Sequence, residues 1–250
     1  MVKEILDEQY ADDHEKQRID FFVPDAPRGE VALLFIHGGG WEKGGKEQWH
    51  AVAKHFANLG YMSASAGYRL TDSAVYPAQP EDTEAALLYM KRQSARFGFN
   101  PQRVLAIGSS AGGYLAAMLA IAARNEGART QGAILYCPVT DLLAGGDFIR
   151  KFMGCPPEGN ERLYREASPL CRITGAEPPF LILQGDADKT TPLQQAEAFH
   201  GALLKAGANS ELEVLEGVGH GFGYGTETAA QAQAIRRMEA YLQVRFPGQA

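Results

Sequence analysis

The chain has 250 residues and a net charge of −6, with acidic residues outnumbering basic ones. Its basic residues form no run of five or more, so we expect no nucleic-acid partner, because phosphate binding needs concentrated positive charge. The first ten residues carry Lys3, Glu4, Asp7 and Glu8, and no stretch reaches about 18 apolar residues. The sequence therefore predicts no membrane span and a cytoplasmic protein, and it leaves self-association open.

Neither the cysteines nor the paired histidines indicate a metal site. Cys137, Cys155 and Cys171 are odd in number and widely spaced, which fits neither a disulfide framework nor a zinc site. His50 and His55 lie five residues apart in a helical pattern, about 140° around the axis, so they cannot share one ion. We expect free thiols, no metal and no cofactor.

Short apolar runs alternate along the chain with segments of helical periodicity. The expected strands are Arg18–Val23, Val31–Ile36, Tyr61–Tyr68, Arg103–Ile107, Gly132–Tyr136, Phe180–Gln184 and Glu211–Leu215. The expected helices are Lys46–Leu59, Pro80–Phe97, Ser110–Ala123, Pro192–Lys205 and Thr226–Phe246. Apolar strands alternating with helices predict an α/β fold, with a mostly parallel central sheet and helices on both faces.

Residues 140–174 break this alternation. The segment contains paired glycines and prolines and only short periodic pieces, at Asp147–Met153 and Glu161–Ala167. Long connections in compact domains commonly cover a functional site. We expect a single domain over residues 1–250, with this segment inserted as a small cap.

The strongest local motif is Gly108-Ser109-Ser110-Ala111-Gly112, placed between an expected strand and an expected helix. A serine on such a tight turn needs neighbours without side chains, and the helix N-terminus supplies free amides where an oxyanion would form. The motif therefore predicts that Ser110 is a nucleophile. The residue after it, Ala111, is an expected oxyanion-hole donor.

A second glycine-rich motif, His37-Gly38-Gly39-Gly40-Trp41, follows the strand Val31–Ile36. Glycines let the backbone approach a ligand closely, so Gly38 or Gly39 is expected to give the second oxyanion donor. Gly40, Gly45 and Lys46 also have phosphate-loop spacing, but Glu47 stands where a magnesium-binding Ser or Thr belongs. We therefore do not expect a nucleotide site.

A serine nucleophile needs a histidine base and an orienting acid, which follow it along the chain in α/β-hydrolases. His200 lies inside an expected amphipathic helix, whereas His220 lies in a loop after the last strand, so His220 is the expected base. For the acid, Asp186 and Asp188 both follow the strand Phe180–Gln184. Spacing alone leaves both aspartates open, with Asp188 somewhat favoured.

With these motifs in hand, the chain resembles the hormone-sensitive-lipase-like and acetyl-esterase branch of the α/β-hydrolases. It is most similar to small bacterial feruloyl-esterase-like carboxylesterases, over about Arg18 to Leu242. The resemblance places the acid on Asp188 and implies a serine esterase acting on a small-molecule ester with a short or aromatic acyl group. Trp41 and Phe222 flank the expected catalytic loops and are candidates for the pocket wall. Two departures from the family pattern, Gln184-Gly185 and Lys189-Thr190-Thr191, are expected to lie away from the triad.

Two other functions fit parts of this pattern. An amidase resembling kynurenine formamidase would carry the same His-Gly-Gly-x-Trp signature. A silent binding protein like the gibberellin receptors would share the fold but lack the histidine that this chain has at His220. A secreted lipase is less consistent, because the chain shows neither a signal peptide nor a large apolar lid.

Overall fold

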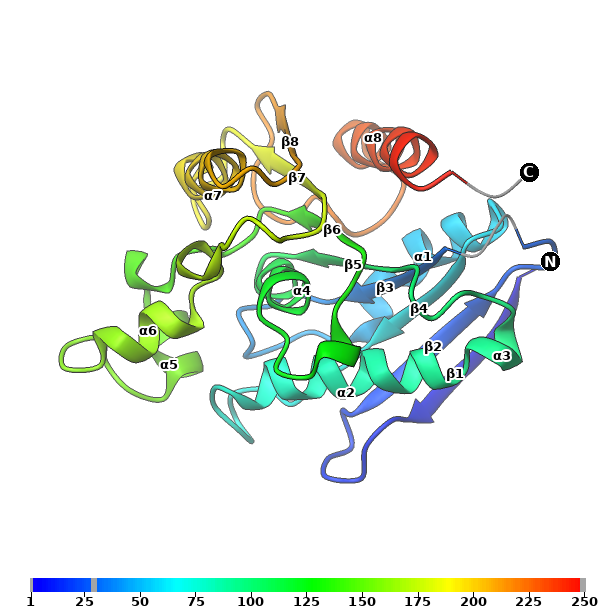
Figure 1. Cartoon of the computed structure of the whole chain (residues 1–250), viewed down its shortest axis with the longest axis horizontal. Helices are drawn as coiled ribbons and strands as arrows, with labels where there is room; N and C mark the ends of the chain where they lie inside the picture. Colours follow the sequence, from blue (N-terminus) through cyan, green and yellow to red (C-terminus); the bar gives the residue numbers. More distant parts are fainter. Residues whose placement is uncertain (1, 28–30, 248–250) are drawn as a thin grey trace.

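The structure is a computed structural model, and it describes residues 2–27 and 31–247. The ends of the predicted domain, residues 1 and 248–250, lie outside the described residues. The described residues form an eight-stranded sheet in the order β1-β2-β4-β3-β5-β6-β7-β8 (Figure 1). The β1–β2 and β2–β4 pairs are antiparallel, and all other neighbours pair in parallel, as the apolar strands predict.

The strands match the expected runs closely at the sheet centre. Their bounds are β1 (Lys3–Gln9), β2 (Arg18–Val23), β3 (Ala32–Ile36), β4 (Met62–Ala66), β5 (Val104–Ser109), β6 (Gly132–Tyr136), β7 (Phe180–Gly185) and β8 (Ser210–Leu215). In β3, Leu34 and Ile36 face one core while Leu33 and Phe35 face another. A strand that is buried on both faces must be apolar throughout, which is why the central strands read as unbroken apolar runs.

Helices cover both faces of the sheet (Figure 1). The helices α1 (His50–Asn58) and α8 (Ala229–Arg245) pack with Leu33 and Phe35. The helices α2 (Ala78–Arg92), α4 (Ala111–Ile121) and α7 (Leu193–Lys205) pack on the opposite face. Two of the expected helices are each two elements in the structure. The expected helix Lys46–Leu59 begins as a 3-10 turn, η1 (Lys46–Trp49), and the expected helix Pro80–Phe97 divides into α2 and α3 (Ser94–Phe97).

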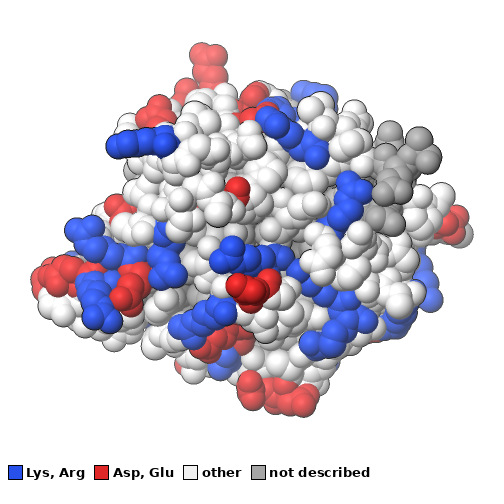
Figure 2. Space-filling model, viewed as in Figure 1, with Lys and Arg blue, Asp and Glu red and all other residues white. Residues whose placement is uncertain are grey.

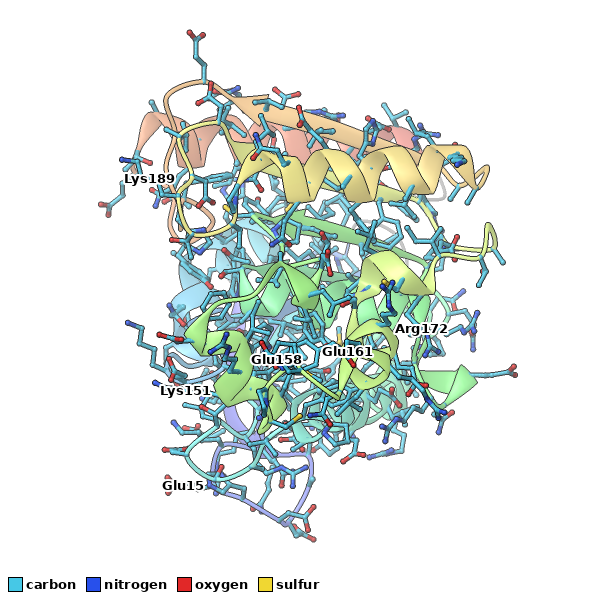
Figure 3. The ribbon with its side chains drawn as sticks, turned by 90° about the vertical axis from the view of Figure 1, so that its left-hand side faces the viewer. Glu15, Lys151, Glu158, Glu161, Arg172 and Lys189 are labelled. Atoms are coloured by element: carbon cyan, nitrogen blue, oxygen red, sulfur yellow. The ribbon has the colours of Figure 1, made fainter. Side chains whose placement is uncertain are left out.

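The segment over residues 140–174 contains η3 (Leu142–Ala144), α5 (Asp147–Met153), α6 (Glu161–Ala167) and η4 (Pro169–Arg172). Its two ends are joined, because the Leu170 amide donates to the Thr140 carbonyl at 3.0 Å and the Leu142 amide to Ser168 Oγ at 3.0 Å. Figure 3 looks onto this end of the molecule, with Lys151, Glu158 and Glu161 marking the segment in front of the sheet. The segment therefore leaves the sheet after β6 and returns to the same place before β7.

The described surface carries charges of both signs. On the face shown in Figure 2, basic and acidic side chains lie interspersed. Ion pairs such as Arg124–Glu81 and Arg162–Glu166 bring opposite charges together at the surface. Within residues 2–27 and 31–247, no helix combines the length and the apolar character needed to cross a membrane.

Candidate active site

Ser110 stands on a strained turn between β5 and α4. Its φ of 56° and ψ of −119° lie in a region that residues with a side chain rarely adopt. A Cβ at Gly108 would lie 2.0 Å from the Gly112 carbonyl, and one at Gly112 would lie 2.1 Å from the Ile36 carbonyl. Both glycines are therefore required for the turn, as the motif predicts.

The turn presents Ser110 at the start of the buried helix α4. The Ser110 amide donates to the Tyr136 carbonyl at 2.8 Å, which fixes the turn against β6. The Ala111 amide follows at the first position of the helix and donates to no described group. Unpaired amides and the positive end of the helix dipole favour negative charge next to Ser110.

An aspartate and a histidine meet at the same edge of the sheet. Asp188 follows β7 and His220 follows β8, and the distance from Asp188 Oδ2 to His220 Nδ1 is 2.7 Å. The Asp188 side chain is fully buried, while the His220 side chain is 24% exposed. Asp188 can therefore orient the ring and stabilise its protonated form, with the Nε2 edge left for another group.

Neutral donors hold the Asp188 carboxylate. The amides of Thr190 and Thr191 donate to Oδ1 at 2.8 and 2.9 Å, and the Thr191 hydroxyl donates to Oδ2 at 3.0 Å. Gln184 Nε2 adds a longer contact to Oδ2 at 3.3 Å. Burial alone would raise the pKa of Asp188, but the hydrogen bonds from His220 and these amides bring it below its ordinary value.

These contacts correct one expectation from the sequence. Gln184 and the Lys189-Thr190-Thr191 stretch were expected to lie away from the triad, yet Gln184, Thr190 and Thr191 all contact Asp188. The expectation was wrong because the strand end and the following turn wrap around the carboxylate. Lys189 itself projects to the outside of this loop (Figure 3).

The alternative acid and base lie elsewhere. Asp186 accepts the Gly217 amide at 2.7 Å and so links the loops after β7 and β8, without contacting His220. His200, on α7, bonds through Nδ1 to the Ser210 hydroxyl at 2.8 Å. Of the two aspartates that spacing left open, the geometry therefore brings only Asp188 to the histidine.

A cavity of about 380 Å³ joins Ser110 and His220. The other lining residues come from the glycine motif and the segment through η1, from the end of β5, from α5 of the cap and from the loops after β7 and β8: Gly39, Gly40, Glu42, Lys43, Gln48, Ser109, Phe148, Thr190, Gly221 and Tyr224. No hydrogen bond joins Ser110 Oγ to His220 in the described part of the chain. Such contacts are often long before a substrate binds, so the shared cavity is the relevant observation.

The amides proposed for the oxyanion differ in their partners. Gly38 donates its amide hydrogen to the Tyr224 hydroxyl at 2.6 Å. The amides of Gly39, Gly40 and Ala111 donate to no group among the described residues. Gly39 and Gly40 are among the residues that line the cavity, and Gly38 and Ala111 are not. Of the three expected oxyanion donors, Gly39 and Ala111 therefore have unpaired amides, and the Gly38 amide is paired with Tyr224.

The two candidate pocket residues lie behind the cavity, and neither is among its lining residues. Trp41 is fully buried and stacks on Phe152 with ring centroids 4.0 Å apart. Phe222 is nearly buried and packs on Tyr136. The aromatic lining comes instead from Phe148 on α5 and from Tyr224. Tyr224 could have been found from the sequence, because it lies four residues after His220 in a run where glycines alternate with aromatic residues.

Two groups of the described residues bear on whether a metal or a phosphate could bind. Cys137, Asp188 and His220 come within 4.8 Å of one another, but burial raises the pKa of the Cys137 thiol far above its usual range. Metals bind the thiolate, so this group is poorly prepared for one. Lys46, at the end of the phosphate-loop spacing, is bound to Asp20 at 2.8 Å instead of facing an open loop.

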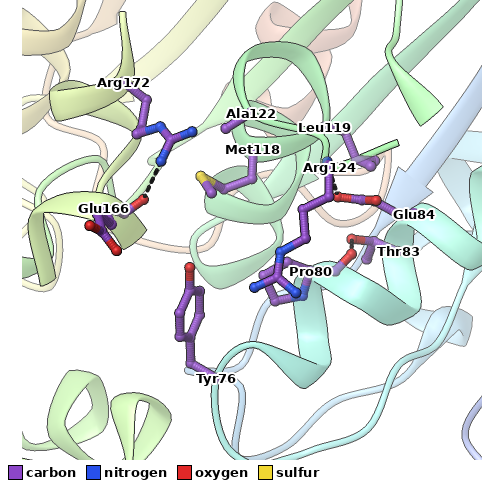
Figure 4. A pocket seen from close by; sticks show the side chains of 10 residues that line it. All are labelled: Tyr76, Pro80, Thr83, Glu84, Met118, Leu119, Ala122, Arg124, Glu166 and Arg172. Atoms are coloured by element: carbon purple, nitrogen blue, oxygen red, sulfur yellow. Dashed lines mark hydrogen bonds between the residues drawn. The ribbon is translucent and has the colours of Figure 1, made fainter. Parts of the chain in front are cut away.

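A second cavity, of about 140 Å³, is lined by residues of α2, α4 and the cap segment (Figure 4). Tyr76, Arg124 and Arg172 project into it, and Glu84 and Glu166 also line it. None of the site residues expected from the sequence lines this cavity. This cavity is therefore separate from the site expected from the motifs.

A parallel sheet with a strained serine after one central strand and an Asp–His pair at the same edge defines an α/β-hydrolase. Residues 19–203 match the BD-FAE family, and the chain belongs to it. This confirms the resemblance expected from the motifs.

Two relatives from Mycobacterium tuberculosis are similar in sequence. Esterase LipQ is 31% identical over 205 residues, which cover 74% of this chain and 49% of LipQ. The probable carboxylic ester hydrolase LipM is 29% identical over 191 residues, which cover 68% of this chain and 44% of LipM. The chain thus spans about half the length of these relatives.

Esterase 2 of Thermogutta terrifontis is similar in structure. Its apo form has a TM-score of 0.84 and 25% identity, covering 98% of this chain and 96% of that one. Its butyrate-bound form has a TM-score of 0.83 and 25% identity, covering 97% and 94%. In contrast to the mycobacterial relatives, this esterase is matched over nearly its whole length.

Proposed function

We propose that this chain is a serine carboxylesterase in which Ser110, His220 and Asp188 form the catalytic triad. The observation that carries the proposal is the 2.7 Å contact between Asp188 and His220, in the cavity that a strained Ser110 shares. The esterases LipQ, LipM and esterase 2 support the same class of reaction. We further propose that the cap belongs to the same domain as the sheet. Residues 140–174 then contribute Phe148 to the substrate cavity.

The reaction proceeds through a covalent acyl-enzyme. His220 Nε2 takes the Ser110 proton as Ser110 Oγ attacks the ester carbonyl, and Asp188 stabilises the resulting imidazolium. The amides of Gly39 and Ala111 bind the oxyanion, and the free amide of Gly40 lies beside them. The bond to the alcohol breaks as His220 returns the proton to the leaving oxygen. Water then repeats the sequence and releases the acid.

The cavity favours a small substrate. About 380 Å³ is enough for a short or aromatic acyl group with a small alcohol, and Phe148 supplies an apolar wall. The butyrate-bound esterase 2 structure is consistent with a short acyl group. We therefore propose acetyl to butyryl esters, or esters of an aromatic acid, as the substrate class.

A panel of esters that varies the acyl and alcohol parts separately tests this function. Ser110→Ala should lose activity on every ester by at least about 10⁴-fold in kcat/KM, because no other group replaces the nucleophile. Ser73→Ala, at an exposed turn, is the matched control and should retain full activity. N-formylkynurenine belongs in the same panel, and its preferential turnover would replace the esterase by an amidase.

A further inference from the structure

Tyr224 lies in the loop after β8, four residues after His220, and contacts outside the triad hold it beside Ser110. A Cβ atom at Gly223 would lie 3.1 Å from the Tyr136 ring and 3.2 Å from the Trp49 ring, so the glycine lets the loop pack closely on these two rings. The Tyr224 ring meets Trp49 edge-on, with centroids 4.9 Å apart. The Gln231 side chain donates to the Tyr224 carbonyl and ties it to the start of α8. The tyrosine is therefore fixed in position.

The hydroxyl of Tyr224 lies next to the nucleophile. It accepts the Gly38 amide hydrogen at 2.6 Å. A Cβ on Gly38 would lie 2.7 Å from this hydroxyl and 3.3 Å from Ser110 Cβ. The hydroxyl and the Ser110 side chain thus contact the same face of Gly38, and Tyr224 lines the cavity together with Ser110 and His220.

The proton of this hydroxyl is available to a ligand. Within the described residues, the Tyr224 hydroxyl accepts the Gly38 amide hydrogen and donates to no group, and the neighbouring Ser109 hydroxyl does not reach hydrogen-bond geometry with any acceptor or donor. Burial raises the pKa of Tyr224 to about 12, although the Gly38 amide and the Ser109 hydroxyl oppose the shift. The phenol therefore stays neutral and keeps its hydrogen at neutral pH. A buried donor without an acceptor, facing a cavity, is prepared for one that a substrate brings.

We propose that the Tyr224 hydroxyl donates a hydrogen bond to the carbonyl oxygen of the ester as negative charge develops on that oxygen. The Gly38 amide holds the hydroxyl in place and polarises it, so Gly38 acts on the substrate through Tyr224 instead of directly. The inference rests on the proposed esterase function, because it needs a carbonyl oxygen beside Ser110. It adds a side-chain donor to the backbone amides of Gly39 and Ala111.

A gate is the alternative role for the same residue. If the hydroxyl only occupied space that the substrate must clear, removing it would leave turnover unchanged or raise it. If it donates to the oxyanion, removing it lowers kcat and leaves KM nearly unchanged, since the bond strengthens in the transition state. Loss of one oxyanion donor typically costs about 10²-fold or more in kcat. A lower kcat on removing the hydroxyl is therefore expected only if Tyr224 is a donor.

The test compares Tyr224→Phe with Tyr241→Phe on p-nitrophenyl acetate. Tyr241, on α8, has a buried hydroxyl without a described partner, and it does not line the cavity, so its variant controls for loss of a phenol oxygen. Endpoint labelling by a fluorophosphonate counts folded active sites, and kcat is expressed per labelled site. We expect a drop of about 10²-fold in kcat for Tyr224→Phe and wild-type turnover for Tyr241→Phe.

A thionoester separates oxyanion binding from a general structural effect. Sulfur accepts hydrogen bonds weakly, so the thiono analogue of the same ester gains little from Tyr224. Tyr224→Phe should therefore slow the ester far more than the thionoester. Equal losses on both substrates, or unchanged or increased turnover of the ester, would overturn the proposal.

Ser110→Ala, measured in parallel, keeps the two proposals distinguishable. If the wild type hydrolyses the ester and Ser110→Ala does not, a normal Tyr224→Phe rejects the role of Tyr224 alone. If Ser110→Ala keeps its activity, the esterase mechanism fails and the role of Tyr224 fails with it.

Discussion

Two buried aspartates in this molecule each bind a histidine, but with different neighbours. Asp188 Oδ2 lies 2.7 Å from His220 Nδ1, and Asp20 Oδ2 lies 2.8 Å from His50 Nε2. Both carboxylates are fully buried. The contact distance and the burial of the carboxylate therefore do not distinguish the Asp188–His220 pair from the Asp20–His50 pair.

The partners of the carboxylate do separate them. Asp20 also binds the Lys46 ammonium at 2.8 Å, and Lys46 reaches Asp7 and Glu47 as well. A permanent cation thus already compensates Asp20. Asp188 receives only neutral donors besides His220, so the cation it can stabilise is the imidazolium. An Asp–His contact is prepared for catalysis when no fixed cation competes for the carboxylate.

The largest expected effect of this difference is on turnover. Asp188→Asn should lower kcat about 10⁴-fold, because the amide favours the wrong tautomer of His220 and cannot stabilise the imidazolium. Asp20→Asn should change kcat by less than about threefold, since His50 is outside the cavity lining. Steady-state hydrolysis of p-nitrophenyl acetate measures both, and a comparable loss in the two variants would contradict the comparison.

The second effect is on stability and runs the other way. Asp20→Asn leaves the nearly buried Lys46 with only its exposed partners and should lower the free energy of unfolding by about 3 kcal/mol. Urea denaturation at pH 7 measures this change. Asp186→Asn, at an exposed turn, is the control and should cost about 1 kcal/mol. A loss for Asp20→Asn no larger than the control would show that the Lys46 pair does not hold this region.

A smaller effect tests the neutral donors around Asp188. Thr191→Val removes the hydroxyl that donates to Asp188 Oδ2 at 3.0 Å and should lower kcat about tenfold, equivalent to about 1.4 kcal/mol. Thr191→Ser keeps the hydroxyl and should restore most of the activity. Equal activity in the Val and Ser variants would mean that the amides alone hold the carboxylate.

The smallest effect is the pH dependence of the Asp20 cluster. Burial would raise the pKa of Asp20, but hydrogen bonds from His50, the Asp7 amide and Lys46 lower it below its ordinary value. A lowered folded-state pKa stabilises the protein above the unfolded pKa of about 3.9, and this stability is lost as the pH falls through the folded value.

Melting temperatures of the wild type and Asp20→Asn measure this contribution. From pH 6 down to about pH 3.5, the wild type should fall about 2–4 °C further than the variant, which corresponds to about 1 kcal/mol. Parallel pH profiles would show that Asp20 contributes nothing to the acid sensitivity.

The parts of the site that sterics dictate could be predicted from the sequence. The turn from Gly108 to Gly112 has no room for a Cβ atom at either end, so the two glycines in the sequence predicted the tight turn at Ser110. The central strands were equally clear, because burial on both faces demands apolar residues. The strand β1 was missed since its Lys and Glu residues are exposed, and it joins the edge of the sheet by pairing with β2.

The parts that depend on distant contacts could not be predicted from spacing. Asp186 and Asp188 lie in the same loop, and they differ in which part of the loop after β8 each contacts: Asp186 accepts the Gly217 amide, and Asp188 binds His220. The role of Gly38 likewise depends on Tyr224, which is 186 residues away in sequence. Trp41 was expected at the pocket wall because of its place in the motif. The structure stacks it on Phe152, a contact that the motif could not indicate.

The most direct test of the central claim is the site of covalent modification. The protein is treated with a fluorophosphonate, digested and mapped by mass spectrometry, alongside Ser110→Ala and Asp188→Asn. We expect a single adduct on Ser110 in the wild type, no adduct in Ser110→Ala and slowed labelling in Asp188→Asn. An adduct on another residue, or ester hydrolysis that persists in Ser110→Ala, would contradict it.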